Sequence, residues 1–146
     1  MTQKLTTLLT LFALAWTGLS QADQMKLPTH VPVEKLKWFD TGIGPVKAAV
    51  AFGEMATGPY GAFLKFPGGF VSPVHHHSAE YQAVVVKGTI VNSEKGEKDV
   101  RMRPGSYWYQ RGKASHVTKC VSSSGCTVFL TQPGKFDFLH HEGDKH

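Results

Sequence analysis

Apolar residues along the chain gather in short segments separated by turn-forming residues, and no window shows a sustained helical period of 3.6. Short segments rich in valine, phenylalanine and tyrosine are typical of β-strands. The stretches between them contain glycine and proline, as in Pro67-Gly68-Gly69 and Pro104-Gly105, which favour turns. Strands are expected at residues 36–39, 46–52, 60–66, 70–77, 81–91, 98–102, 106–110, 115–120, 126–131 and 136–139.

Many short strands joined by such turns predict an all-β sandwich or barrel. A jelly-roll barrel is one way in which a sheet of this kind protects its edges. The chain has 146 residues, of which 41% are hydrophobic, so it is long enough for one core and one domain. No internal repeat, linker or low-complexity block divides it.

Residues 1–22 have the organisation of a secretory signal peptide. Lys4 gives a positive start, an apolar run follows at residues 8–19, and Ser20-Gln21-Ala22 places small residues where signal peptidase reads. The run is short for a membrane span, so an uncleaved anchor is the less favoured alternative. We therefore expect cleavage before Asp23, export to the periplasm or the medium, and no membrane attachment afterwards.

The mature chain is expected to consist of an arm, a barrel and a tail. Residues 23–35 contain two prolines and few large apolar side chains, which predicts an extended arm. Such an arm lies along a sheet edge or reaches a partner subunit, so the sequence leaves open whether the chain forms a homodimer. The barrel is expected over residues 36–139, and residues 140–146 are a polar, histidine-containing tail that is expected to fray.

The charge of the chain does not indicate a nucleic-acid partner. The formal net charge is +5, and removal of Lys4 with the leader would lower it by one. From Glu94 to Asp99 the charged residues alternate in sign, as at the solvated tip of a hairpin, and the arginines form no cluster. A partner with a phosphate backbone is therefore not expected.

Three consecutive histidines carry the strongest functional signal. His75 and His77 are two residues apart, so on an extended strand their imidazoles leave from the same face, while His76 points to the other. Two imidazoles on one face of a strand can bind the same metal ion. The turn-forming pair Ser78-Ala79 is short enough to place side chains of the next strand beside this grip.

This stretch resembles the first motif of the cupin superfamily. In that motif a glycine, five residues, His-x-His, three or four residues, a glutamate and, about six residues later, a glycine follow one another. Gly69, His75, His77 and Gly88 match these positions. The resemblance implies the cupin-type double-stranded β-helix, a jelly-roll barrel that holds a ligand or a metal inside.

The second half of the chain resembles the second cupin motif, which ends in a histidine on a later strand. Pro104-Gly105-Ser106 is similar to the opening of this motif, and residues 112–116 are similar to its end. His116 is thereby implied as the third metal ligand. The resemblance covers about residues 36–139 and, through features such as Gly134-Lys135-Phe136, is strongest to the small exported ChrR-like cupins.

The resemblance implies a divalent transition metal, Fe, Zn, Ni or Mn, at His75, His77 and His116, because imidazole triads bind these ions. Cupins include oxygenases, isomerases, lyases and decarboxylases. We therefore expect a small metal-dependent enzyme of the oxygenase or lyase type that acts on a small molecule in the barrel. A module that binds or senses a ligand without turning it over is the alternative.

The sequence does not identify the fourth metal ligand, because the family's glutamate is missing at its usual place. Glu80, Tyr81 and Gln82 follow the turn, and strand alternation puts Glu80 and Gln82 on one face and Tyr81 on the other. We expect Gln82 and Glu80 about equally as the fourth ligand. Tyr81 ranks behind them, because a phenol with a pKa near 10 must lose its proton to bind a metal well.

Tyrosines are expected to line the pocket, because a tyrosine combines an apolar body with a hydrogen-bond donor. The candidates are Tyr81, Tyr107 and Tyr109.

The two cysteines, Cys120 and Cys126, are expected to form a disulfide. An exported chain meets an oxidising compartment, and the five residues between them suit a hairpin closed by a bridge. A loop this short contributes about 2 kcal/mol. Because Cys120 lies four residues after His116, a thiolate ligand or a redox group near the metal is the alternative.

Overall fold

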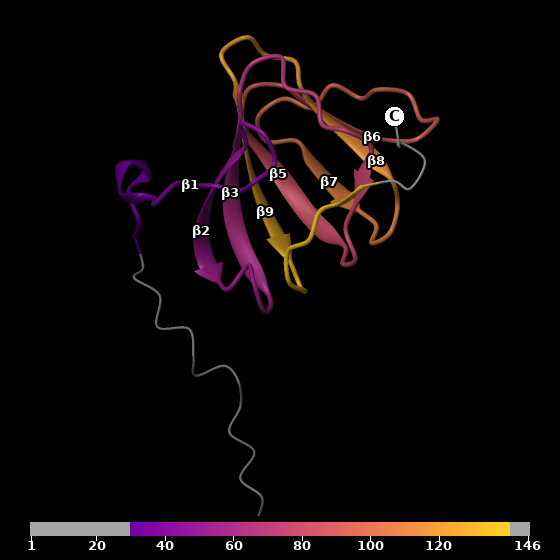
Figure 1. Cartoon of the computed structure of the whole chain (residues 1–146). Coiled ribbons are helices and arrows are strands. Elements are labelled where there is room, and N and C mark those ends of the chain that lie inside the picture. The colour runs from indigo at the N-terminus through magenta and orange to yellow at the C-terminus, as the bar shows by residue number, and fades with distance from the viewer. Residues whose placement is uncertain (1–29, 141–146) are drawn as a thin grey trace, which may run out of the picture.

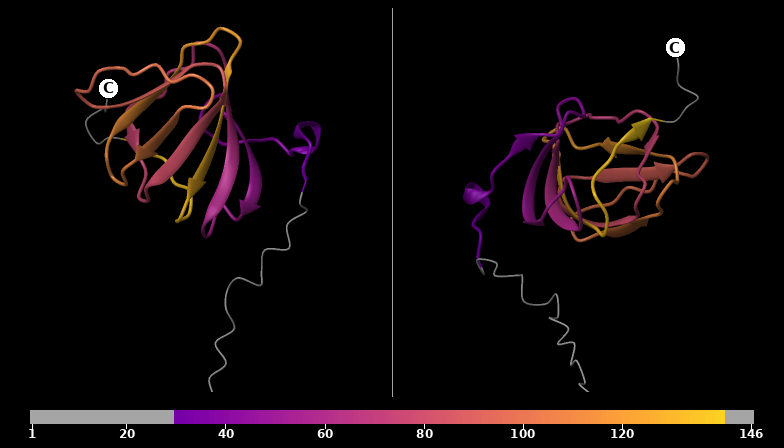
Figure 2. Two further views of the ribbon diagram at one scale, coloured as in Figure 1. Left: turned by 180° about the vertical axis from the view of Figure 1, so that it is seen from behind. Right: turned by 60° about the horizontal axis from the view of Figure 1, so that its bottom comes forward.

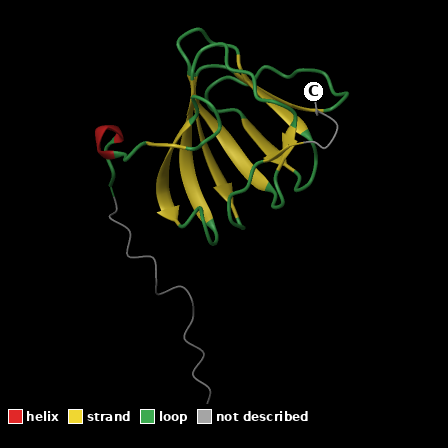
Figure 3. Cartoon of the chain, viewed as in Figure 1, coloured by secondary structure: helices red, strands yellow, loops and turns green. Residues whose placement is uncertain are grey.

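The computed structural model describes residues 30–140, in which ten β-strands follow one short helix (Figures 1 and 3). The helix is the 3₁₀ turn η2 (Val33–Lys35). The strands are β1 (Phe39–Asp40), β2 (Lys47–Gly53), β3 (Tyr60–Phe66), β4 (His75–His76), β5 (Tyr81–Lys87), β6 (Ile90–Glu94), β7 (Tyr107–Gln110), β8 (His116–Cys120), β9 (Cys126–Gln132) and β10 (Leu139–His140).

The strands form two antiparallel sheets that face each other as a jelly-roll barrel. Sheet A has the strand order β1-β2-β3-β9-β5-β7, and sheet B has the order β10-β4-β8-β6. Both views of Figure 2 show the segment before β1 outside the barrel. The all-β, cupin-type fold predicted from the sequence is therefore confirmed.

Several sequence expectations concern residues outside the described range. The signal peptide at residues 1–22, the first part of the arm and most of the tail at residues 140–146 lie there. The described part of the arm, residues 30–35, is exposed throughout. Among the described residues, no helix has both the length and the apolar character needed to cross a membrane.

Most of the predicted strands are present, and the differences have local causes. The strand predicted at 60–66 is β3 without change. The segment at 81–91 is divided into β5 and β6, because Gly88 between them has a φ of +79° and turns the chain. The segments at 70–77 and 98–102 are mostly irregular, and outside the short strand β4 they contribute isolated bridges to Lys119 and Ile90.

Alternation of side chains places one face of sheet A inside the barrel. On β5, Tyr81, Ala83 and Val85 are buried, whereas Gln82 and Val84 are exposed. Residues 83–86 thus alternate between the interior and the surface. The register of β5 decides which of its side chains reach the centre of the barrel.

Replacing Gly88 by alanine should strongly destabilise the protein. A Cβ atom there would lie 2.6 Å from the carbonyl oxygen of Gly125 and 2.9 Å from Cys126 Sγ, at the start of β9. The positive φ adds a cost of about 1 kcal/mol, and the clash raises the expected loss to about 3 kcal/mol or more. Urea unfolding measures it.

Gly96 provides the matched control, because it has a φ of +89° but no atom within 4 Å of the position of a Cβ. Gly96→Ala should therefore show the cost of the backbone conformation alone. Equal losses in the two variants would mean that the contact with Gly125 is unimportant.

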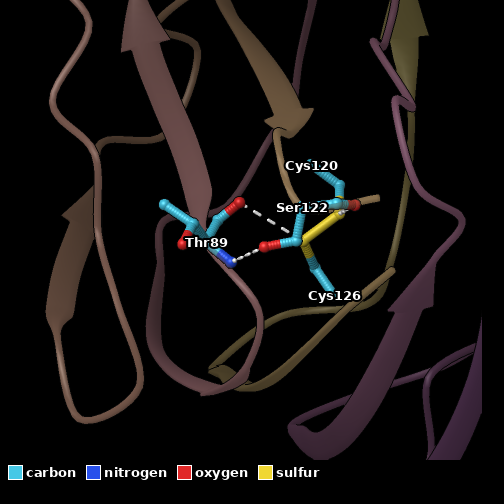
Figure 4. The surroundings of a disulfide bond; sticks show 4 residues. All are labelled: Thr89, Cys120, Ser122 and Cys126. Atoms are coloured by element: carbon cyan, nitrogen blue, oxygen red, sulfur yellow. Dashed lines mark hydrogen bonds between the residues drawn. A yellow bond between two sulfur atoms is a disulfide. The ribbon is translucent and has the colours of Figure 1, made fainter. Parts of the chain in front are cut away.

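A disulfide joins the two sheets at one end of the barrel (Figure 4). Cys120 ends β8 in sheet B and Cys126 begins β9 in sheet A, and their Cα atoms are 5.8 Å apart. Beside the bridge, the backbone N–H of Thr89 donates to Ser122 Oγ at 2.9 Å. The predicted disulfide is confirmed, and it links two sheets rather than closing a hairpin, because β8 and β9 pair with different neighbours.

Candidate metal centre

Three histidines meet between the two sheets. β4 pairs with β8 so that His75 lies opposite His116, and cross-strand partners share one face of a sheet. His77 follows His75 by two residues and lies on the same side. Their exposed fractions are only 4%, 8% and 1% for His75, His77 and His116, and one ligand atom from each lies within 4.8 Å of the others.

The neighbouring histidines lie elsewhere. His76 pairs with Leu139 at the edge of sheet B and is partly exposed, as the strand parity predicted. His140 ends β10 and is exposed, and His141 and His146 lie outside the described residues.

Hydrogen bonds fix the tautomer of all three buried rings. Each Nδ1 atom faces a backbone carbonyl oxygen: His75 faces that of Pro73 at 3.0 Å, His77 that of Asp137 at 2.5 Å, and His116 that of Ala114 at 3.1 Å. A carbonyl oxygen only accepts hydrogen bonds, so Nδ1 carries the proton in each ring. Each Nε2 atom is then left with the lone pair that binds a metal.

Burial keeps the three rings neutral. It lowers the pKa of His75 to about 3, with a further decrease from nearby His116, and it lowers the pKa of His116 to about 4. The pKa of His77 is also below its usual 6.5 because of burial. At neutral pH all three imidazoles are therefore in the form that binds a metal.

The cluster fits a divalent transition metal. Three neutral imidazoles suit Zn, Fe, Ni or Mn. Nitrogens bound to one ion at about 2.1 Å lie about 3.4 Å apart in a tetrahedral site, so an ion would draw the rings together by up to about 1.4 Å. No aspartate or glutamate in residues 30–140 joins the cluster, so the described ligands are uncharged.

Tyr81 is the side chain of sheet A that reaches the histidines. It is 5% exposed, and its hydroxyl oxygen lies 3.3 Å from His116 Nε2. Glu80 and Gln82 are exposed and lie beside a depression on the outer surface. This arrangement differs from the order expected from the sequence, which placed Glu80 and Gln82 ahead of Tyr81, because the register of β5 turns Tyr81 inward.

The Tyr81 hydroxyl belongs to a buried hydrogen-bond network that the sequence did not reveal. Burial raises the pKa of Tyr81, so the phenol keeps its proton. Besides His116, the hydroxyl lies 3.4 Å from Asn92 Oδ1. Asn92 Nδ2 donates to Gln110 Oε1 at 2.8 Å, and Thr118 Oγ1 donates to Asn92 Oδ1 at 2.7 Å. No motif marked these residues, because their contact depends on the pairing of β6, β7 and β8.

A small cavity of about 60 Å³ lies beside the histidines. Its lining is mostly apolar and includes Ile43, Leu64, Phe66, Phe70, Val128 and Leu130. Tyr81 lines it, whereas Tyr107 and Tyr109 do not, since alternation along β7 turns Trp108 and Gln110 inward and leaves the two tyrosines 57% and 49% exposed.

Residues 136–138 lie against the histidine cluster. Phe138 stacks on His75 with ring centroids 4.1 Å apart and an angle of 15° between the ring planes, and the ring of Phe136 lies 5.9 Å from that of His77. The N–H of Phe136 donates to the carbonyl oxygen of Met55 at 2.7 Å, and Asp137 Oδ1 accepts from the N–H of Ser78 at 2.9 Å. These contacts hold two aromatic rings over the cluster.

Comparisons with known proteins agree with this fold. The family described as "Domain of unknown function (DUF4437)" matches residues 31–139. A comparison with curated proteins found no match.

Among solved structures, the chain is similar to an RmlC-like cupin from Shewanella frigidimarina NCIMB 400, with 17% identity, a TM-score of 0.61, and coverage of 75% of this chain and 93% of that one. It is also similar to the DMSP lyase DddQ from Ruegeria pomeroyi DSS-3, with 16% identity, a TM-score of 0.63, and coverage of 77% and 64%. A third is the polyketide cyclase RemF from Streptomyces resistomycificus, with 12% identity, a TM-score of 0.65, and coverage of 80% and 87%. At these identities the likeness establishes the fold alone.

Proposed function

This chain belongs to the DUF4437 family and has a cupin fold, and we propose that it is an exported protein that binds one divalent transition metal through His75, His77 and His116. We further propose that it is a small metal-dependent enzyme, of the oxygenase or lyase type, whose substrate is a small molecule held in the barrel. The metal is Fe, Zn, Ni or Mn.

The observation that carries this proposal is the tautomer shared by the three buried histidines. Each Nδ1–H is held by a backbone carbonyl oxygen, which leaves the Nε2 lone pair of each ring free, and one ring nitrogen of each histidine lies within 4.8 Å of the others in a site shielded from water. Metal-binding histidines are commonly oriented by such a hydrogen bond from the second ring nitrogen. Three unrelated core histidines have no reason to share it.

The chain's own residues supply the surroundings of the reaction. A bound ion would contribute Lewis acidity or, in the case of iron, oxygen chemistry. Phe138 and Phe136 keep water from the histidine face, which strengthens the electrostatic interactions inside. Tyr81 holds a proton on its hydroxyl oxygen beside His116, so it is placed to donate a hydrogen bond to a ligand there.

Similar folds serve catalysis in other proteins, including a lyase and a polyketide cyclase. This supports an enzyme without identifying its reaction. One observation favours the alternative, a module that binds or senses a ligand without turnover: the cavity is only about 60 Å³ and aromatic rings lie across the histidines.

The proposal is tested by the metal content of the protein purified without a histidine tag. We expect one divalent ion per chain, removable by a chelator and restored by dialysis against the metal. Iron would favour an oxygenase, whereas zinc or nickel would favour a lyase or a binding role. A site that is empty after purification and cannot be refilled would contradict the proposal.

Tyr81→Phe should weaken metal binding, whereas Glu80→Ala and Gln82→Ala should not. Only Tyr81 points to the histidines, and its hydroxyl oxygen lies 3.3 Å from His116 Nε2, about the separation of two ligands of one ion. We therefore expect Tyr81→Phe to lower the affinity about 10-fold, or about 1.4 kcal/mol. Competition with a chromogenic chelator measures the affinity. A larger effect of Gln82→Ala than of Tyr81→Phe would show that the register of β5 differs from the one described.

A further inference from the structure

The last part of the described chain joins the two sheets beside the histidines. Residues 133–140 leave the end of β9 in sheet A and finish as β10, which pairs with β4 in sheet B. The right-hand view of Figure 2 shows this segment, in yellow, running from one sheet to the other. Because Phe136 and Phe138 lie on it, the segment carries both rings that cover the histidines. We call residues 133–140 the strap.

The strap also orients one of the proposed ligands. The carbonyl oxygen that accepts from His77 Nδ1–H at 2.5 Å belongs to Asp137, which is 60 residues away in the sequence. For the other two ligands the accepting carbonyl lies two residues earlier in the same segment: Pro73 for His75 and Ala114 for His116. Two of the ligands therefore have local partners, whereas His77 keeps its partner only while the strap is in place.

Few contacts hold the strap in place. Neither the disulfide nor any ion pair among the described residues includes a strap residue, and none of the strap residues is fully buried. Segments with few buried contacts open at a free energy well below that of global unfolding. The strap can therefore release while the barrel stays folded. Besides the bond to His77 and the pairing of β10 with β4, three hydrogen bonds hold it: Phe136 N–H to the carbonyl oxygen of Met55, Gln132 Nε2 to the carbonyl oxygen of Lys135, and Ser78 N–H to Asp137 Oδ1.

From these contacts we infer that the strap and the metal are coupled, and that Asp137 is the positioning residue that couples them. In the closed position the strap holds the proton of His77 on Nδ1 and leaves Nε2 free for the ion. An ion that binds the closed form better must, by thermodynamic linkage, favour that form to the same degree. The bound ion therefore keeps the strap closed, and release of the strap uncovers the histidine face for the exchange of metal or ligand. This inference rests on the proposed function in taking the three histidines as metal ligands.

Asp137→Ala and Asp137→Asn form a matched pair of variants for testing the coupling. Both remove the charge of the carboxylate, but asparagine keeps an oxygen that accepts from the N–H of Ser78, and alanine does not. Asp137 is partly exposed, so neither change disturbs the core. A difference between the two variants thus reports the hydrogen bond that anchors the strap rather than the charge.

The first measurement needs no metal, because ¹⁵N spectra of the histidine side chains in the metal-free full chain report the tautomer of each ring. We expect His77 to carry its proton on Nδ1 in the unchanged protein and in Asp137→Asn. In Asp137→Ala the ring should interconvert between the two tautomers. His116, whose partner Ala114 is local, is the internal control and should keep its tautomer in all three proteins.

The second measurement is amide hydrogen exchange, with and without zinc, together with the zinc affinity of the same proteins. We expect zinc to slow exchange of the strap N–H of Phe136 at least about 10-fold, and to leave the N–H of Glu97, beside the turn after β6, unchanged. The zinc affinity should fall about 10-fold in Asp137→Ala and about threefold or less in Asp137→Asn. In His116→Ala, zinc should no longer protect Phe136.

Three results would overturn the inference: a His77 tautomer that stays fixed in Asp137→Ala, an equal loss of zinc affinity in both Asp137 variants, or an exchange rate at Phe136 that zinc does not change. Protection of Phe136 by zinc in His116→Ala would overturn it too, because zinc would then act from outside the histidine cluster. One bound zinc ion without protection of the strap refutes this inference alone. A His77 tautomer that depends on Asp137 in a protein that binds no zinc supports the positioning role and refutes the proposed metal site.

Discussion

Replacing His116 by alanine should reduce the bound metal from one ion per chain to none. The variant removes one of the three clustered imidazoles, and among the described residues no carboxylate joins the remaining pair, His75 and His77, to replace it. We expect the affinity to fall by more than about 100-fold, because losing a ligand costs more than losing a residue that only hydrogen-bonds to a ligand. Metal analysis after dialysis against zinc measures the loss, and the increase in melting temperature with added zinc should disappear as well.

His76→Ala is the matched control for this experiment. His76 lies between two of the proposed ligands in the sequence but is partly exposed on β4, next to the edge strand β10 of sheet B. The substitution should leave the metal content and the response to zinc unchanged. Equal losses in the two variants, or full occupancy in His116→Ala, would contradict the assignment of ligands.

Acid should destabilise the metal-free protein over a range set by the buried histidines. His75 and His116 have pKa values of about 3 and about 4 in the folded protein against an ordinary 6.5. Between these values the unfolded chain binds protons that the folded chain does not, so the free energy of unfolding decreases as the pH decreases below 6.5. From pH 6.5 to pH 4.5 the two residues together contribute a loss on the order of 4 kcal/mol.

Urea unfolding of the metal-free protein across this pH range checks the expectation. Bound zinc should protect the protein, because protons and the metal compete for the same Nε2 atoms. His76→Ala should show the same pH dependence as the unchanged protein, since His76 is not part of the buried cluster. A stability that stays constant from pH 6.5 to pH 4.5 would show that the histidines are not held neutral by burial.

The sequence was most informative where the chemistry is local. The i, i+2 spacing of His75 and His77 predicted that both point to one side and His76 to the other, and alternation along the strand produces that arrangement. The disulfide between Cys120 and Cys126 could likewise be predicted from the sequence, because the two cysteines are close in the chain and an oxidising compartment was expected.

The sequence did not reveal in this way which side chain of β5 reaches the histidines. A shift of one residue in the turn before β5 exchanges Tyr81 with Glu80 and Gln82 on the inner face, and the sequence does not determine that shift. Ligand chemistry then favoured the carboxylate and the amide, whereas the structure places the phenol inside.

The remaining features of the site depend on strands that are far apart in the sequence. The contact of Asn92 with Gln110 and Thr118 follows from the pairing of β5 with β7 and of β6 with β8. Tyrosines were expected in the pocket for their chemistry, but alternation along β7 turns Trp108 inward instead of Tyr107 and Tyr109.

The most direct test of the metal centre is a crystal structure of the zinc-loaded protein with data collected on both sides of the zinc absorption edge. The proposal predicts a single strong anomalous peak between the two sheets, within bonding distance, about 2.1 Å, of the Nε2 atoms of His75, His77 and His116. A barrel without a peak at these histidines, or with zinc bound only by the histidines of the C-terminal tail, would contradict it.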